Sequence, residues 1–466
     1  MFKRAIHLAS LGLVLFVTAA AVIAGGKAPV DEPWMQYSDV RNGGFDPDRL
    51  DSVRRQADEL GSGAVFIVRG GLVVAAWGDV QRKFKCHSVR KSLLSALYGP
   101  AVAQGQIKLD ASLADLDIDD VHGLTESERQ ATVEQLIQSR SGVYHPAAKE
   151  PRSMKQGRPE RGSATPGETF WYNNWDFNTA GYVFELATGR GILEAFAEDL
   201  ARPLGMEDFQ LDDTYYQYER KSSRVPAYTF RLSARDLARL GLLYLRDGKW
   251  GDRQLVPAEW IERSWTAHSD LGDGEGYGYM WWTYGPGSQP SHPELFAFAA
   301  RGTGGQLLVV IPALDLVVVH RGDTDFSPPL GGSEVWKLVH GIIASIDGEA
   351  RPATKPEPVE VQPFAKRLPP LSFPKTVTLP PETLDRYVGR YQVGPNVEVE
   401  ISRLGEMLVG QMTGFGETDL YPIAETDFWS RSAGVTVKFE LDEENNVVRG
   451  TMRMQGQDMV AVPVGR

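Results

Sequence analysis

The sequence places a serine and a lysine three residues apart at the start of an apolar run, in the stretch CHSVRKSLL that begins at Cys86. On a helix, this spacing puts the side chains of Ser88 and Lys91 on one face. A serine hydroxyl becomes an effective nucleophile when a neighbour accepts its proton, and a lysine can accept it when its pKa is lowered. Burial and the positive end of a helix both lower a lysine pKa. The pair predicts nucleophilic catalysis, although Ser-x-x-Lys also recurs by chance.

A second group of candidate residues lies in the stretch FWYNNW that begins at Phe170, directly after the turn signal Pro166-Gly167. Tyr172 can relay a proton to a leaving group when it lies near a Ser/Lys pair. The side-chain amide of Asn174 can donate to a substrate carbonyl and accept from a lysine. The alternative is an aromatic core cluster with an asparagine cap.

A glycine-rich stretch, ARGTGGQ from Ala300 to Gln306, leads into the apolar run 307–311. Glycines at the start of a strand let a ligand approach backbone N–H groups closely, which is the geometry of an oxyanion hole. Gly302 and Thr303 are the candidate substrate-binding residues of this stretch. The alternative is a simple hairpin turn.

Other residues that could do chemistry have weaker support. His87 adjoins Ser88, but consecutive helix residues do not face each other, so a packing or loop role is favoured. Cys86 is predicted to be a buried thiol rather than a nucleophile. The sequence contains no Gly-x-Ser-x-Gly elbow and no phosphate-binding Gly-x-x-x-x-Gly-Lys. We therefore predict a serine enzyme that uses no metal and no organic cofactor.

The elements that must position these residues follow from hydrophobic periodicity. The apolar runs 64–68 and 72–77 flank Arg69-Gly70-Gly71 and predict a hairpin. The runs 307–311 and 316–319 predict a second pair of buried strands. Between the two pairs lie helical patterns at 92–103, 132–138, 178–187, 192–200 and 234–245. Strands at both ends with helices between them predict an α+β domain whose single sheet joins the two ends.

Composition limits the function classes. The chain has 466 residues, 42% of them hydrophobic and 24% charged, and a net charge of −12. An acidic chain without a long Lys/Arg run repels polyanions, so nucleic acid is not an expected partner. With one cysteine, an intrachain disulfide is impossible. Residues 1–24 resemble an export signal, which predicts a periplasmic or secreted protein; an uncleaved membrane anchor is the alternative.

The sequence changes once in composition, at a proline-rich segment over 351–381. Such a segment favours an extended, semi-rigid linker with few contacts across the boundary. We therefore predict a catalytic domain at 25–350 and a second domain at 382–466. The second domain alternates with period two at 397–401, 436–441 and 459–462, which predicts a small all-β, barrel-like fold.

Taken in this order, the three motifs resemble those of the class C β-lactamase and penicillin-binding DD-peptidase family of serine hydrolases. The resemblance extends to stretches without catalytic residues, such as Pro203-Leu204-Gly205-Met206 and 233–239. It implies an antiparallel sheet flanked by helices. It also implies roles for the motif residues, in which Ser88 is the acylated nucleophile, Lys91 its base, Tyr172 the proton relay and Asn174 a contact for substrate and lysine.

The third motif departs from the family pattern, because Ala300-Arg301-Gly302 stands where lactamases have Lys-Thr-Gly. The resemblance still implies an oxyanion hole from the backbone N–H of Ser88 and one at Gly302 or Thr303. It favours a small-molecule ester, amide or peptide-like substrate, cleaved through an acyl-enzyme. The alternatives are a β-lactamase or peptidoglycan DD-peptidase, and a binding protein that retains the fold. The tail resembles lipocalin-like β-domains appended to such hydrolases, which cap the active site or bind a partner; the oligomeric state is left open.

Overall fold

The computed structural model describes residues 33–286, 294–353, 355–371, 373–413, 416–454 and 457–465. The predicted export signal, residues 1–24, lies outside this part of the chain. Within the described ranges, no helix has both the length and the apolar character needed to cross a membrane.

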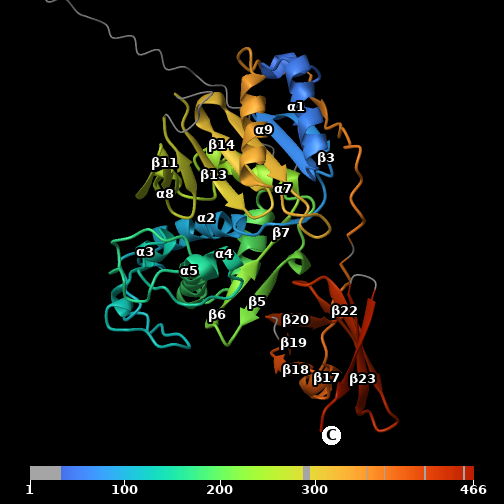
Figure 1. The fold of residues 1–466 in the computed structure, drawn as a ribbon. Coiled ribbons are helices and arrows are strands. Elements are labelled where there is room, and N and C mark those ends of the chain that lie inside the picture. Colours follow the sequence, from blue (N-terminus) through green and yellow to red (C-terminus); the bar gives the residue numbers. More distant parts are fainter. Residues whose placement is uncertain are drawn as a thin grey trace, which may run out of the picture.

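The catalytic part is built on a ten-stranded sheet (Figure 1). Its strands, in spatial order, are β10 (Ser269–Gly272), β11 (Glu275–Tyr277), β12 (Trp282–Tyr284), β13 (Ala297–Gly302), β14 (Gln306–Ile311), β15 (Leu316–Arg321), β2 (Ala64–Arg69), β3 (Leu72–Gly78), β1 (Met35–Gln36) and β16 (Glu357–Pro358). All neighbours pair antiparallel except β1 and β3. Strand β15 lies beside β2, with Val318 opposite Ile67, so one sheet does join the two ends of the domain.

The β2–β3 hairpin forms where the sequence predicts it. Gly70 and Gly71 both have positive φ angles, +62° and +82°, which suits the two-residue turn that matches strand twist. Every residue of β2 is buried. A strand buried on both faces reads as a continuous apolar run rather than as an alternation.

Two helical layers cover the sheet (Figure 1). On one face, α1 (Pro47–Leu60) and α9 (Gly332–Ala344) pack on Val65 and Ile67. On the other, α2 (Val89–Ala103) and α7 (Ala234–Leu245) pack on Phe66 and Val68. The predicted helices 92–103 and 234–245 correspond to α2 and α7, whereas α1 and α9 were not predicted.

The remaining helices and short strand pairs surround the sheet (Figure 1). The predicted helix 192–200 is α6 followed by a π-helical turn at Ala197–Ala201. The helices are α3 (Val133–Ile137), α4 (Arg152–Gly157), α5 (Asn174–Thr188), α6 (Ile192–Phe196) and α8 (Ala258–Trp265). Helices α3, α4 and α5 lie below α2, and α8 lies beside β11 (Figure 1). The short strand pairs are β4 (Phe84–Lys85) with β7 (Arg231–Leu232), β5 (Tyr215–Glu219) with β6 (Ser223–Thr229), and β8 (Lys249–Trp250) with β9 (Arg253–Gln254).

The C-terminal part is a closed eight-stranded barrel. Helix α10 (Pro381–Asp385) precedes β17 (Gly389–Gly394), β18 (Val397–Leu404), β19 (Met407–Met412), β20 (Glu417–Pro422), β21 (Asp427–Ser430), β22 (Val435–Leu441), β23 (Val447–Met454) and β24 (Gln457–Pro463). Pairing of β17 with β24 closes the barrel, and closure removes exposed strand edges. Tyr387, Phe428 and Phe439 pack against one another in its core.

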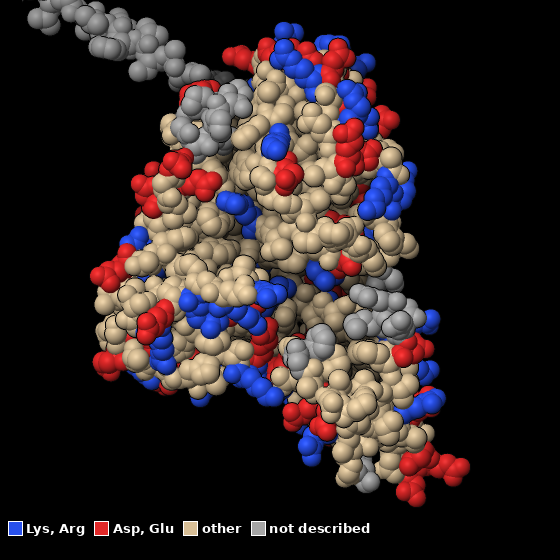
Figure 2. Space-filling view, in the orientation of Figure 1, with Lys and Arg blue, Asp and Glu red and all other residues tan. Residues whose placement is uncertain are grey.

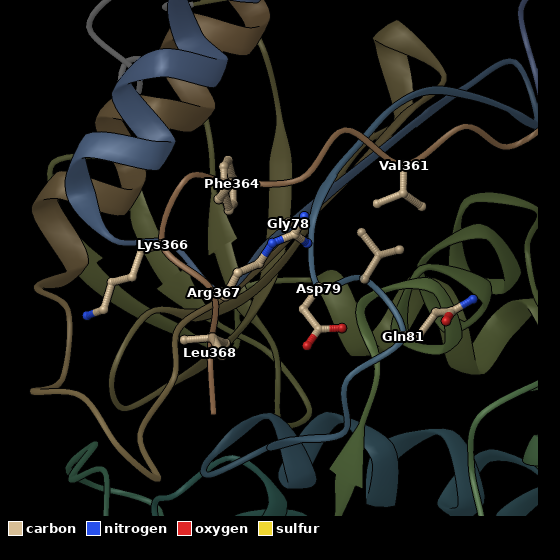
Figure 3. A pocket seen from close by; sticks show the side chains of 10 residues that line it. Gly78, Asp79, Gln81, Val361, Phe364, Lys366, Arg367 and Leu368 are labelled. Carbon is tan, nitrogen blue, oxygen red and sulfur yellow. The ribbon is translucent and has the colours of Figure 1, made fainter. Parts of the chain in front are cut away.

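The proline-rich segment is extended, as predicted, but the expectation that it makes few contacts with the catalytic part is wrong. Strand β16 pairs with β1, and the backbone of Gln362 exchanges hydrogen bonds with Ala76 and Gly78 of β3. The side chain of Phe364 is only 5% exposed. Figure 3 shows it above Gly78, beside a pocket of about 310 Å³. Prolines are tolerated here because the segment adds to a sheet edge, where unpaired positions need no N–H donor.

The barrel contacts the β5–β6 hairpin of the catalytic part (Figure 1). Arg220 Nε lies 3.0 Å from Glu417 Oε1 on β20, and Arg431 Nη2 lies 2.8 Å from Asp212 Oδ1. Figure 2 shows acidic and basic side chains interspersed over this face of both parts. The interface is therefore polar and ion-paired.

Candidate active site

The beginning of α2 brings the predicted nucleophile and lysine together. Ser88 is the N-cap residue of α2, and Lys91 lies one turn further along. The backbone of Cys86, two residues before Ser88, is held in place because its N–H donates to Phe230 O, next to the paired strands β4 and β7. The side chain of Lys91 is almost completely buried, with 1% exposure. The side chains of Ser88 and Lys91 therefore lie on one face of α2, as their spacing predicts.

The Lys91 ammonium position is the centre of the site. Its Nζ lies 2.9 Å from Ser88 Oγ, 2.8 Å from Tyr172 OH and 3.0 Å from Asn174 Oδ1. A neutral amine has two hydrogens and one lone pair. It can therefore donate to two of these oxygens and accept from the third, Ser88 Oγ–H.

Burial sets the protonation states of these groups. The pKa of Lys91 is held well below its ordinary value, mainly by burial and further by the positive charges of Arg90 and Lys149. Burial raises the pKa of Tyr172 to about 12. Lys91 is thus disposed to be neutral and Tyr172 to keep its proton, which is the combination that a base and a proton donor need.

Tyr172 and Asn174 are placed by the start of α5. Asn173 caps this helix, since its side chain accepts from Asp176 N at 2.8 Å. Ser141 Oγ donates to the Asp176 carboxylate at 2.5 Å, and burial raises the pKa of that carboxyl to about 7. Asp176 is a supporting residue that the sequence analysis missed, because its partner Ser141 is 35 positions away.

The predicted glycine stretch reaches Ser88 from the sheet. A side chain at Gly302, the last residue of β13, would place its Cβ 2.6 Å from Cys86 O and 3.2 Å from Ser88 N. Only glycine allows this close approach. The backbone at Gly302 therefore lies against the backbone N–H of Ser88, and Ser88 together with Gly302 or Thr303 remains the candidate pair for an oxyanion hole.

Two adjoining hollows open at the nucleophile, and Ser88, Tyr172 and Thr303 line both. The smaller, about 270 Å³, contains Arg301, whose guanidinium lies 4.7 Å from the Trp282 ring centroid. The larger is about 900 Å³. Further residues lining the larger hollow include His87, Arg90, Lys149, Asn174 and Glu219. Five of the six predicted site residues line these hollows, and the sixth, Lys91, lies beneath them in contact with Ser88, Tyr172 and Asn174.

The weaker candidates have structural roles. His87 Nε2 lies 2.8 Å from Thr324 Oγ1, and burial lowers the pKa of His87 to about 3. Cys86 is a buried thiol, as predicted. In the described part of the chain, no group of three or more His, Cys, Asp or Glu side chains is arranged to hold a metal ion. Sequence reasoning missed Arg90 and Lys149, which no motif marked.

Two family models match the sequence. The model described as Beta-lactamase matches residues 48–320, and the model described as a domain of unknown function (DUF3471) matches residues 374–462. The first match covers more than half of the chain, so the protein belongs to the β-lactamase family of serine hydrolases. The resemblance seen in the three motifs is thereby confirmed. No curated protein matches the sequence.

Solved structures share the fold at low sequence identity. A Bacillus anthracis protein assigned as a 6-aminohexanoate-dimer hydrolase superposes with a TM-score of 0.52 at 20% identity, covering 69% of this chain and 88% of that one. An octameric penicillin-binding protein homologue from Pyrococcus abyssi gives a TM-score of 0.48 at 18% identity, covering 90% of this chain and 100% of that one. A class C β-lactamase gives 0.48 at 14%, covering 65% and 96%.

Proposed function

We propose that this serine hydrolase cleaves a small-molecule ester or amide through an acyl-enzyme on Ser88, with Lys91 and Tyr172 as the proton-transfer groups. The observation that carries the proposal is the position of Lys91 Nζ, which is buried and within 3.0 Å of Ser88 Oγ, Tyr172 OH and Asn174 Oδ1.

Acylation begins when Ser88 Oγ attacks the substrate carbonyl carbon and its proton passes to neutral Lys91. The negative charge that develops on the carbonyl oxygen is held by the N–H groups of Ser88 and Thr303. As the tetrahedral intermediate collapses, Tyr172 gives its proton to the departing alcohol or amine and recovers one from Lys91. Water then attacks the acyl-enzyme, and the same groups return Ser88 to its starting state.

The third motif favours an ester or amide over a lactam. Ala300 and Arg301 stand where lactamases have lysine and threonine. Ala300 is completely buried, so of these two residues it is Arg301 that lines the smaller hollow. The Arg301 guanidinium donates to Tyr284 OH at 2.9 Å and stacks on Trp282. Arginine does not replace lysine at a fixed point-charge contact. A lost charged contact is worth about 1.5–3 kcal/mol, which corresponds to one to two orders of magnitude in rate.

Intact-mass spectrometry after exposure to a fluorophosphonate tests the nucleophile. Wild-type protein is expected to gain one adduct, whereas Ser88→Ala should gain none and should lose ester hydrolysis while keeping its thermal unfolding transition. Ser92→Ala is the matched control, because Ser92 Oγ donates to Met280 O away from Lys91 Nζ. Labelling of Ser88→Ala, or activity within tenfold of wild type, would reject Ser88 as the nucleophile.

The substrate class is tested by kcat/KM for a short-chain aryl ester and for nitrocefin on the same preparation. We expect clear ester hydrolysis and weak or absent nitrocefin turnover. Nitrocefin turnover equal to or above the ester value would favour the β-lactamase alternative. Absence of both turnover and labelling would favour a binding protein that retains the fold.

A further inference from the structure

The larger hollow beside Ser88 contains a lysine that no motif assigns. Lys149 lies half-buried in its wall, at the end of the loop that follows α3. Its φ angle is +59°, a left-handed conformation that a non-glycine residue adopts only when the surroundings impose it. Three contacts impose it here: Asn174 Nδ2 donates to Lys149 O at 2.6 Å, Asn178 Nδ2 donates to Ala148 O at 3.1 Å, and Lys149 N donates to Glu219 Oε1 at 2.9 Å.

The ammonium group of Lys149 has no carboxylate partner. Among the described residues, no acidic oxygen lies within 4.0 Å of its Nζ, whose hydrogen bond is to Thr229 Oγ1 at 3.3 Å. The Tyr215 ring centroid lies 5.5 Å from it. A charge that has lost part of its hydration and has no counter-ion is costly, so a retained one is a candidate for ligand binding.

A second positive charge of the hollow, Arg90, has no carboxylate partner among the described residues, and its guanidinium lies 4.3 Å from the Tyr228 ring centroid. Arg90 is 1% exposed, and its Nη2 donates to the neutral side chain of Asn178 at 2.7 Å. Its Nη1 is buried without a hydrogen-bond partner among the described residues. The two cations repel each other across a poorly solvated wall, and an anion in the hollow would relieve that repulsion.

The acids nearest to Lys149 are already engaged elsewhere. Glu219 accepts the Lys149 backbone N–H and lies 4.0 Å from Lys155 Nζ. Asp419 of the barrel accepts the N–H groups of Arg431 and Ser432. Lys85 and Arg231, the other cations whose charges act on Lys149, both pair with Asp325. Glu150, which also lines the hollow, pairs with Arg158. Each of these carboxylates therefore has a partner other than Lys149 Nζ.

We propose that Lys149, with Arg90 adding charge from behind, binds a carboxylate carried by the substrate, so that the preferred substrates are esters or amides with an anionic end. This inference rests on the proposed function, since the carboxylate is placed in the same hollow as the Ser88 hydroxyl. In this proposal the positive charge that binds the carboxylate is on Lys149, in the loop after α3. It is not on the third motif, which belongs to β13.

Two matched aryl esters test the inference. One is the para-nitrophenyl monoester of glutarate; the other has the same chain with an isopropyl group in place of the carboxylate. The quantity measured is the ratio of their kcat/KM values, because removing Lys149 also alters the pKa of Lys91 and affects both esters. Wild type should prefer the anionic ester, and Lys149→Met should lower the ratio about 10- to 100-fold.

Lys155→Met is the control, because Lys155 is an exposed lysine of α4 that does not line the hollow. It should leave the ratio within twofold of wild type. Equal loss in both variants, or an unchanged ratio in Lys149→Met, would overturn the inference while leaving ester hydrolysis and the proposed function intact.

A binding experiment separates the inference from catalysis. In the Ser88→Ala background, calorimetric titration with the glutarate monoester should show a Kd that Lys149→Met weakens about tenfold or more. If wild type hydrolyses neither ester but this Lys149-dependent binding is found, the proposed function fails and the carboxylate site stands. If neither variant binds the monoester, the carboxylate site is rejected.

The preference should also depend on pH. Burial, followed by the charges of Arg90, Lys85 and Arg231, lowers the pKa of Lys149 to about 7, with Asp419 acting in the opposite direction. The ammonium form is present below that pH and is lost above it. The ratio of anionic to neutral ester kcat/KM should therefore fall as pH rises through about 7, and a ratio independent of pH from 6 to 8 counts against Lys149 as the binding group. The charged or titratable groups around it are Arg90 and Lys91 on α2, His87 before α2, Glu150 before α4, Lys85 on β4, Tyr215 and Glu219 on β5, Arg231 on β7 and Asp419 on β20.

Discussion

The catalytic cleft and the interior of the barrel are two hollows of one chain that differ in whether charged side chains line them. The cleft is lined by Arg90, Lys149, Tyr172 and other polar groups. The barrel interior holds a cavity of about 180 Å³ whose lining is almost wholly apolar, with Tyr391 OH turned to the backbone of Tyr387. Apolar side chains can fill the interior of a small barrel without a desolvation cost, whereas a cation removed from water costs free energy unless a counter-ion binds it.

The difference separates stability from activity within the molecule. Side chains such as Phe439 in the barrel and Phe364 in the proline-rich segment are buried for packing. Lys91 is buried and Lys149 is half-buried, and both have lowered pKa values, which packing alone does not require. Substitutions in the two classes should therefore change different measured quantities.

The largest expected effect is on proton transfer. Lys91→Ala and Tyr172→Phe should each slow acylation by about 10²–10⁴-fold, the usual contribution of a general acid–base group. Their combination should be far from additive, because the two groups contact each other and share one barrier. Pre-steady-state acylation rates of the four proteins measure this. His87→Asn is the control, since asparagine tolerates a positive φ and His87 contacts Thr324; it should lose less than tenfold. A double-mutant loss equal to the product of two large single losses would contradict the shared relay.

A smaller effect should come from the proline-rich segment, and it should be on stability. Phe364→Ala removes a buried ring that packs on Gly78, at a cost of about 3 kcal/mol in the free energy of unfolding. Val361→Ala, on the same segment but 38% exposed, should cost less than about 0.5 kcal/mol. Chemical denaturation of both variants measures the difference. Equal stability of the two would mean that the segment is a free linker after all.

The smallest effect should come from the interface between the two parts. Arg220 is partly exposed, so Arg220→Ala should destabilise the protein by about 1 kcal/mol or less and leave ester kcat/KM within threefold. Arg449→Ala breaks a comparable pair with Glu440 within the barrel, where both side chains are half exposed, and serves as the control. A loss of ester activity above tenfold for Arg220→Ala alone would show that docking of the barrel shapes the cleft.

Local sequence determined much of this protein. The Ser88–Lys91 spacing, the paired glycines of the β2–β3 turn and the period-two runs of the barrel are each properties of a few neighbouring residues, and each formed the predicted structure. The motif order was also enough to indicate the family that the model of residues 48–320 shows. Such features can be read because turns, helix faces and strand faces depend on short-range geometry.

Only the tertiary structure decided which residues far apart in sequence come into contact and how far they are buried from solvent. Helix α1 carries Leu50, Val53 and Ala57 at helical spacing after an Asp46 cap, a local signal that the sequence analysis did not use, whereas its place against α9 comes from packing across the chain. The sequence placed Phe364 in a linker with few contacts, whereas in the structure its side chain is buried against the edge of the sheet. The lowered pKa values of Lys91 and Lys149 arise from burial and from neighbouring positive charges, with Arg90 acting on both. Desolvation and Coulomb forces act through space between residues far apart in sequence, so no local pattern records them.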